Sequence, residues 1–94
     1  MGMNSTELND AAAKIEAGAN KRRAWAEHTS DPLYVDLYRG VAQQLQDRAE
    51  QVRSWAANSA HLEGCGEVRD PERQTEIEAA TREFLAMAGE KDNG

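Results

Sequence analysis

The fold is decided by residues 29–62, which read TSDPLYVDLYRGVAQQLQDRAEQVRSWAANSAHL. Asp31 and Pro32 form a helix-start signal. An aspartate accepts hydrogen bonds from the free N–H groups of a first turn, and proline at the first helical position has no N–H to leave unpaired. After Pro32, apolar side chains recur at steps of three or four residues, which predicts one uninterrupted helix over residues 32–62. The stripe consists of Tyr34, Leu37, Tyr38, Val41, Leu45, Arg48, Ala49, Val52, Trp55, Ala56 and Leu62.

A shorter helix is predicted on each side of this segment. Residues 6–28 carry apolar and small side chains at helical spacing, and residues 71–89 do the same after a second Asp-Pro pair. Gly64-Cys65-Gly66 predicts the end of the long helix, because glycine adopts the left-handed conformation that closes a helix. We therefore predict an all-α fold and a single helical domain over residues 1–94. It is a small three-helix bundle with one long central helix and a frayed tail at residues 90–94.

The composition agrees with this fold class. The chain has 94 residues, enough for one domain, with 17 acidic and 11 basic side chains and a formal net charge of −6. Nearly half of the residues are Ala, Glu, Lys, Leu or Arg, which is typical of long helices and coiled coils. Arginine outnumbers lysine and alanine is abundant, which favours a bacterium or bacteriophage with a GC-rich genome as the source.

Apolar segments and cysteine content indicate the compartment. No apolar run approaches the length of about 18 residues that a membrane span needs, and the first ten residues are polar. Cys65 is the single cysteine, so no disulfide can form within the chain. We therefore expect an acidic cytoplasmic protein with no membrane partner.

Lys21-Arg22-Arg23 is the one basic cluster, and such clusters bind phosphates by releasing counterions. Arg22, however, lies on the apolar stripe of its helix, where the stem would rest on the edge of the core. The net charge of −6 also argues against nucleic-acid binding. The acidic last third of the chain is either a solvated face or, alternatively, a mimic of nucleic acid.

His61 and Cys65 are spaced by one helical turn, as two ligands of a metal ion would be. Gly64 and Gly66 are expected to end the helix before Cys65 and so to disrupt this spacing. The nearby negative charges of Glu63 and Glu67 disfavour a thiolate at Cys65 and so a nucleophilic cysteine. We predict no catalytic, cofactor or metal site, and we do not expect an enzyme.

The long helix, about 45 Å at 1.5 Å per residue, is longer than two alanine-rich neighbours are expected to cover. We therefore predict a homodimer formed along residues 32–62, or else a monomer whose two other helices lie end to end on the long one. The interface candidates are Tyr34, Tyr38, Val41, Leu45, Arg48, Val52 and Trp55.

The predicted function is a non-enzymatic protein–protein interaction module, such as a small bacterial or phage regulator or inhibitor that binds a host protein. Trp25, Trp55, Tyr34 and Tyr38 each lie on the apolar stripe of their helix, so we expect them to pack in the core. The alternative is that they form the energetic centre of an interface with a partner. The alternative is a protein directed at nucleic acid, either through Lys21-Arg22-Arg23 or as an acidic mimic.

Overall fold

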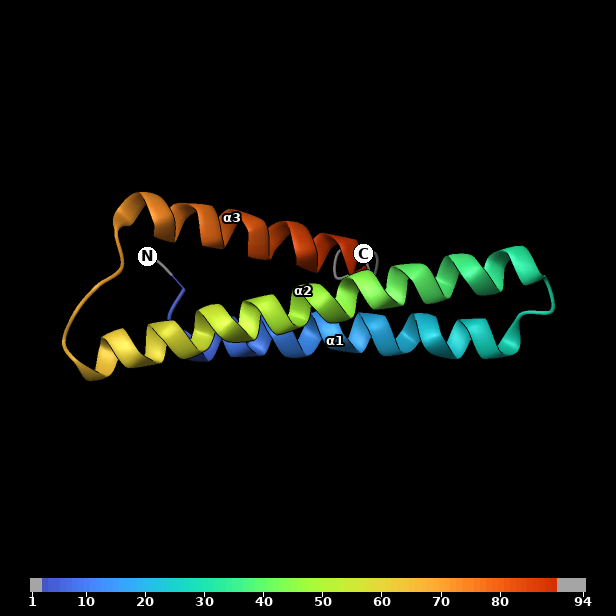
Figure 1. Cartoon of the computed structure of the whole chain (residues 1–94), viewed down its shortest axis with the longest axis horizontal. Helices are drawn as coiled ribbons and strands as arrows, with labels where there is room; N and C mark the ends of the chain where they lie inside the picture. The colour runs from blue at the N-terminus through green and yellow to red at the C-terminus, as the bar shows by residue number, and fades with distance from the viewer. Residues whose placement is uncertain (1–2, 90–94) are drawn as a thin grey trace.

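The computed structural model describes residues 3–89 and shows three helices, α1 (Ser5–His28), α2 (Pro32–Gly64) and α3 (Pro71–Met87). No strand occurs in this range, so the predicted three-helix bundle with a long central helix is confirmed. α1 and α2 form an antiparallel hairpin, and α3 returns along the half of the hairpin that holds the end of α2 (Figure 1). None of the helices within residues 3–89 combines the length and the apolar composition needed to cross a membrane.

The helix starts follow the local sequence signals. Asn4 caps α1 in a reciprocal capping box with Glu7, since each side chain accepts a hydrogen bond from the other residue's backbone N–H. Asp31 caps α2, and its carboxylate accepts from the N–H of Leu33 at 3.0 Å. Asp70 makes no such side-chain bond, so proline alone marks the start of α3.

The end of α2 lies at Gly64, two residues beyond the prediction. Gly66 adopts a φ of 73°, and the N–H of Glu67 reaches back to the carbonyl of Leu62 at 2.8 Å. This pattern satisfies carbonyls of the last turn and reverses the chain. α3 ends at Met87, two residues earlier than predicted, and the tail predicted at residues 90–94 lies outside the described residues.

The core lies mainly between α1 and α2, which contact each other far more extensively than either contacts α3. Leu45 and Val52 are fully buried there. Alanines on both helices let the two backbones approach closely enough for α1 to cover the central part of α2. The buried core residues of this hairpin are Leu8, Ala11, Ala12, Ile15, Ala19, Ala42, Leu45, Ala49, Val52 and Ala56.

This packing corrects two expectations. Leu45 and Val52, predicted to face a second chain, have no exposed surface to offer one. α1 and α3 also do not lie end to end on α2, because α1 runs along the hairpin and α3 lies beside it (Figure 1). The predicted dimer along the whole of α2 was meant to cover an exposed apolar stripe, and α1 already covers the central part of that stripe. The oligomeric state stays a prediction.

α3 covers only part of the hairpin. It has 17 residues against 33 in α2, so it spans about 25 Å of a helix about 50 Å long at 1.5 Å per residue. Its C-terminal end rests on Gly18, near the middle of α1. The end of α1, the turn and the start of α2 extend beyond it as two helices without a third (Figure 1). We call this segment, residues 22–41, the hairpin tip.

Candidate functional site

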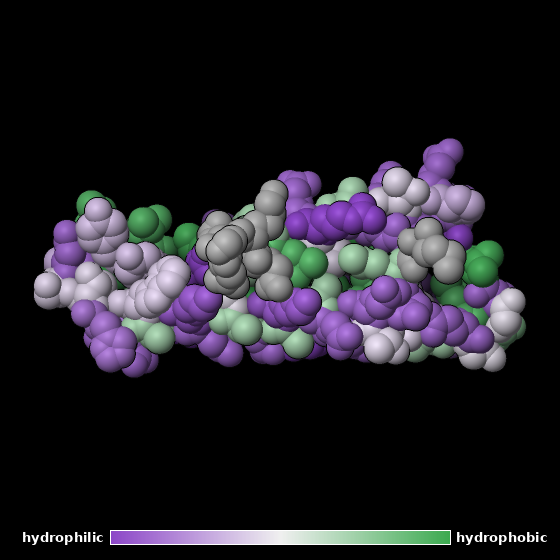
Figure 2. Space-filling model, turned by 180° about the vertical axis from the view of Figure 1, so that it is seen from behind, coloured by the Kyte–Doolittle hydropathy of each residue, from purple (hydrophilic) through white to green (hydrophobic). Residues whose placement is uncertain are grey.

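The hairpin tip carries most of the large apolar side chains that the protein exposes. Trp25 is 43% exposed, Leu33 72%, Tyr34 47% and Leu37 53%. A few hydrophobic side chains reach the surface along one edge of this end of the molecule, among pale and hydrophilic ones (Figure 2). Monomeric proteins seldom expose several neighbouring apolar side chains of this size unless the patch binds something.

The aromatic rings of the tip hold one another in place. The Trp25 ring on α1 meets the Tyr38 ring on α2 edge-on, with centroids 5.5 Å apart. Tyr34 stacks on Tyr38 at 6.0 Å. Together with His28 and Thr29, Trp25 and Tyr38 line a shallow hollow beside the turn. The tip therefore presents a contiguous aromatic surface that spans both helices of the hairpin.

This surface continues the face on which α3 packs. Trp55 stacks on Phe84 of α3 at 6.3 Å, and the Arg48 guanidinium lies 5.3 Å from the same ring. Val41 and Tyr34 follow Trp55 and Arg48 on α2 at further steps of seven residues, so they lie on the same side of the helix. The side of α2 on which α3 packs thus continues into the tip, beyond the end of α3.

Arg22 lies at the C-terminal end of α3, where the hairpin tip begins. Its guanidinium donates to the carbonyl oxygens of Ala88 at 3.2 Å, Met87 at 3.3 Å and Gly18 at 3.2 Å. A cation suits the C-terminal end of a helix, where the carbonyl dipoles accumulate negative charge. The same guanidinium lies 5.3 Å from the centre of the Trp25 ring. Arg22 therefore caps α3 and contacts the aromatic surface as well.

The cations at and beside the tip have no carboxylate partners among residues 3–89. Arg23 donates to the side chains of Asn20 and Gln46, and Arg22 donates to backbone carbonyls. The Nε of Arg48 is buried and has no hydrogen-bond partner. Elsewhere in the described chain, arginines do pair with acids: Arg53 with Glu16, Arg73 with Glu76 and Arg82 with Glu78.

Two of these acids titrate below their usual range. Hydrogen bonds from Arg53 and Gln46 lower the pKa of Glu16, and the charge of Arg53 adds to the effect. A hydrogen bond from Gln74 lowers the pKa of Glu78, assisted by the backbone N–H of Met3. Both carboxylates therefore serve as structural acceptors between segments of the chain.

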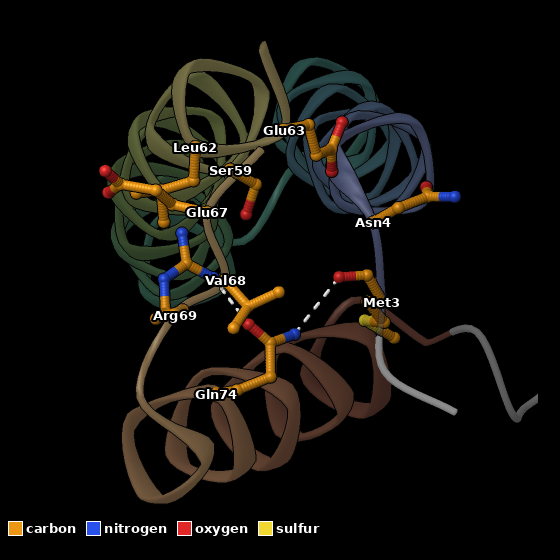
Figure 3. A pocket seen from close by; sticks show the side chains of 9 residues that line it. All are labelled: Met3, Asn4, Ser59, Leu62, Glu63, Glu67, Val68, Arg69 and Gln74. Carbon is orange, nitrogen blue, oxygen red and sulfur yellow. Dashed lines mark hydrogen bonds between the residues drawn. The ribbon is translucent and has the colours of Figure 1, made fainter. Parts of the chain in front are cut away.

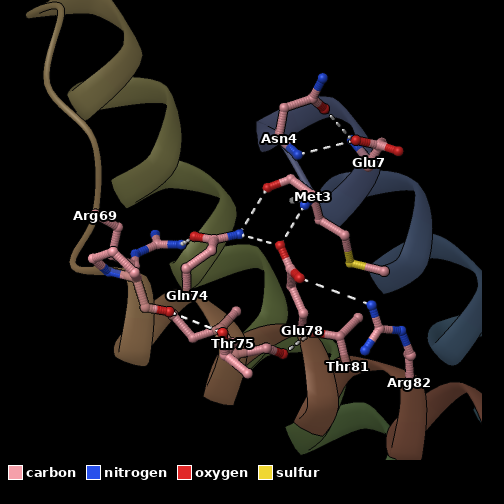
Figure 4. Close-up of polar contacts among 11 residues, drawn as sticks. Met3, Asn4, Glu7, Arg69, Gln74, Thr75, Glu78, Thr81 and Arg82 are labelled. Carbon is pink, nitrogen blue, oxygen red and sulfur yellow. Dashed lines mark hydrogen bonds and ion pairs between the residues drawn. The ribbon is translucent and has the colours of Figure 1, made fainter. Parts of the chain in front are cut away.

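A polar network holds the other end of α3 (Figure 4). The N–H of Met3 donates to Glu78 at 2.6 Å, and the amide of Gln74 donates to the Met3 carbonyl at 3.1 Å. Arg69 donates to Gln74 at 2.8 Å and to the carbonyl of Trp55 at 2.9 Å. The segment before α1, the loop before α3 and α2 are thereby joined.

A cavity of about 250 Å³ lies at this junction, with its lining side chains drawn in Figure 3. Two of the three charged side chains in its wall have partners, because Arg69 is bonded as described and Glu63 accepts from both the N–H and the hydroxyl of Ser5, while the third, Glu67, is exposed. The residues around the cavity therefore serve mainly to hold segments of the chain together, and the tip is the better candidate site. Its lining residues are Met3, Asn4, Ser59, Leu62, Glu63, Glu67, Val68, Arg69 and Gln74.

The predicted interface residues divide into three groups. Tyr34 is exposed at the tip, whereas Leu45 and Val52 belong to the core. Tyr38, Val41, Arg48 and Trp55 are half-buried. The prediction omitted Leu33 and Leu37, although both follow Pro32 within the first turns of the same helix. The sequence carries no direct signal for their exposure, which depends on where α3 stops.

The spacing of His61 and Cys65 survives the end of α2, contrary to expectation. Cys65 still has helical backbone angles, and its exposed Sγ lies 3.9 Å from Nε2 of His61. Within residues 3–89, no three His, Cys, Asp or Glu side chains are grouped so that they could hold a metal ion.

Comparison with family models, with curated proteins and with solved structures finds no match for the chain.

Proposed function

We propose that this protein is a non-enzymatic protein-interaction module and that the hairpin tip is its docking surface. The observation that carries the proposal is the exposure of Trp25, Leu33, Tyr34 and Leu37 on a segment that α3 leaves uncovered. Burying such side chains in a partner is the largest favourable term that this surface can provide, at roughly 25 cal/mol per Å² of apolar area.

The contacts among the aromatic rings support the same proposal. Trp25, Tyr34 and Tyr38 contact one another before any partner arrives, so little side-chain entropy remains to be lost on binding. Tryptophan and tyrosine are also the residue types most often found at the energetic centre of protein interfaces.

The alternative of nucleic-acid binding has less support. Arg22 is committed to carbonyl oxygens at the end of α3, and Arg23 reaches across to Gln46 on α2. The three neighbouring cations therefore do not form one free phosphate-binding patch. The acidic residues are likewise divided, since Glu63 and Glu78 hold segments of the chain together.

Photo-crosslinking in the source cell tests the proposed docking surface. A photoreactive phenylalanine analogue replaces Leu33, which is 72% exposed at the tip, or Ala57, which is exposed elsewhere on α2. We expect an adduct of defined mass from position 33 alone, and its loss when Leu37→Ser is added. Equal adducts from both positions, or an adduct that survives Leu37→Ser, would contradict the proposal.

A further inference from the structure

We infer that the cavity at the junction of α1, α2 and α3 binds a small organic cation, an ammonium group on a short apolar body. The cavity lies at the end of the hairpin opposite to the tip, so this site is separate from the proposed docking surface (Figure 1). Three observations support the inference: a buried hydroxyl without a partner, an apolar rim that is exposed, and an excess of negative charge.

The buried hydroxyl belongs to Ser59, near the end of α2. Ser59 is only 6% exposed, and it forms part of the cavity wall. Its hydroxyl points into the cavity and has no hydrogen-bond partner among residues 3–89 (Figure 3). Because a buried polar group without a hydrogen bond is unfavourable, a ligand that bonds to this hydroxyl gains affinity.

The hydroxyl is free because its usual acceptor is occupied. A hydroxyl on a helix can donate to the carbonyl four residues earlier, as Thr75 and Thr81 do in α3 at 2.9 and 2.7 Å. For Ser59 this acceptor is the carbonyl of Trp55, which accepts the helical N–H and also a hydrogen bond from Arg69 at 2.9 Å. A carbonyl oxygen has two lone pairs, so both are used. The Ser59 hydroxyl is therefore available to a ligand.

Apolar side chains line the other parts of the cavity. Val68 lies at its rim and is 90% exposed, the largest fraction for any large hydrophobic side chain that the structure describes. Leu62 and Met3 add apolar surface to the wall. The volume of about 250 Å³ is below the range of about 300–1,000 Å³ for pockets that hold drug-sized ligands. A short aliphatic chain fits this space and would cover Val68.

The charges around the cavity favour a cation. The wall carries two carboxylates, Glu63 and Glu67, against one guanidinium, that of Arg69. Glu63 accepts its hydrogen bonds from Ser5, which brings no positive charge, and Glu67 pairs with no cation within residues 3–89. Residues 62–94 carry nine acids and four bases, so the potential at this end of the chain attracts positive ligands.

An ammonium group matches these features. It has three N–H donors and no acceptor, so it can donate to Ser59 Oγ and still solvate its other N–H groups with water or a carboxylate. An alcohol of the same length can make the contact with Ser59 but carries no charge. A carboxylate of the same length brings a negative charge to a negative wall. The three head groups therefore distinguish the charge from the hydrogen bond.

Nuclear magnetic resonance titration of the full, ¹⁵N-labelled chain tests the inference. The probes are butylammonium, butanol and butyrate, which share one apolar chain, at the same pH and ionic strength. We expect butylammonium to shift the amide signals of Ser59, Leu62 and Val68 in a saturable manner, with a Kd on the order of 1 mM for so small a ligand. Butanol should bind severalfold more weakly, and butyrate on the order of tenfold or more weakly.

Variants of the protein locate the site. Ser59→Ala should weaken butylammonium severalfold, whereas Ser54→Ala should not, because Ser54 is exposed on the same helix away from the cavity. Ser59→Ala should also stay folded, since the hydroxyl makes no contact that folding needs. Glu67→Gln should reduce the preference for butylammonium over butanol. Glu27→Gln is the matched control, because it makes the same change of charge at the opposite end of the hairpin.

Four results would overturn the inference. No saturable shift with any probe means that the cavity holds only water. Shifts confined to the hairpin tip place the probes on that surface instead. Butyrate that binds as tightly as butylammonium removes the cation from the inference. Binding that Ser59→Ala leaves unchanged shows that the buried hydroxyl takes no part. The crosslink from position 33 tests the docking surface independently of all four.

Discussion

The contact between Gly18 and Ala88 makes a sharp prediction about how α3 is attached. A Cβ added at Gly18 would lie 2.7 Å from the Ala88 Cβ and 2.8 Å from the Ala88 carbonyl oxygen. Ordinary carbon contacts are about 3.5–4.0 Å, so Gly18→Ala must push the end of α3 outward by about 1 Å. That movement also stretches the hydrogen bonds from Arg22 to Met87 and Ala88, which already measure 3.3 and 3.2 Å.

The expected change in the free energy of unfolding is the sum of one stabilising and two destabilising effects. Alanine in the interior of a helix gains about 1 kcal/mol over glycine. Overpacking costs about 1–3 kcal/mol, and weakening bonds from a charged donor adds about 1 kcal/mol. We therefore expect Gly18→Ala to lower the free energy of unfolding by about 1–3 kcal/mol. Gly40→Ala is the control, because no atom lies within 4 Å of the added Cβ, and it should raise that free energy by about 1 kcal/mol.

Urea denaturation followed by far-ultraviolet circular dichroism measures both variants. Adding Ala88→Gly to Gly18→Ala should restore only part of the stability, since the carbonyl oxygen at 2.8 Å remains after the methyl group is removed. If Gly18→Ala and Gly40→Ala stabilise the protein equally, α3 does not rest on Gly18 and the reasoning is refuted.

Four further predictions concern the core, the pH dependence, the oligomeric state and nucleic acid. Leu45→Ala should lower the free energy of unfolding by about 2–5 kcal/mol, whereas Leu33→Ala should change it little, because the first side chain is fully buried and the second is 72% exposed. The pKa values of Glu16 and Glu78 are lowered in the folded chain, so the stability they contribute is present above their ordinary pKa of 4.5 and lost as the pH falls below it. The thermal midpoint should therefore drop on acidification, and the drop should be smaller in Glu78→Gln. Sedimentation velocity over a range of concentrations should show a species of 10.4 kDa, unless the tip self-associates, in which case Leu37→Ser should restore the monomer. Titration with duplex DNA should give no salt-dependent binding, and a steep loss of affinity with added salt would contradict this.

The helices could be predicted because their signals are local. Asp31 and the following proline fix the start of α2 whatever packs against it, and glycine fixes its end. The apolar stripe showed that Leu45 and Val52 are buried, but periodicity cannot tell a neighbouring helix from a second chain. The alanine-rich sequence of α1 suggested a thin cover for α2, whereas small side chains in fact let α1 approach closely.

The candidate site depends on relations between distant segments, which the sequence pattern does not contain. Leu33 and Leu37 are exposed because α3 stops at the level of Gly18. Gly89 follows this end with a φ of 88°, and Arg22 binds the last carbonyls there; the position of Arg22 on the apolar stripe of α1 indicated the edge of the core but not these carbonyls. The length of α3 relative to the hairpin thus decides which part of the predicted stripe is available to a partner.

The positions of the two tryptophans give the protein a built-in optical signal for events at the tip and at α3. Trp55 stacks on Phe84 of α3, while Trp25 lies under the Arg22 guanidinium and borders the docking surface. The fluorescence of each indole therefore depends on a different neighbouring group. In Trp55→Phe, the remaining emission should respond to a partner at the tip, and in Trp25→Phe it should respond to loosening of α3. The two spectra separate ligand binding from partial unfolding without any added dye.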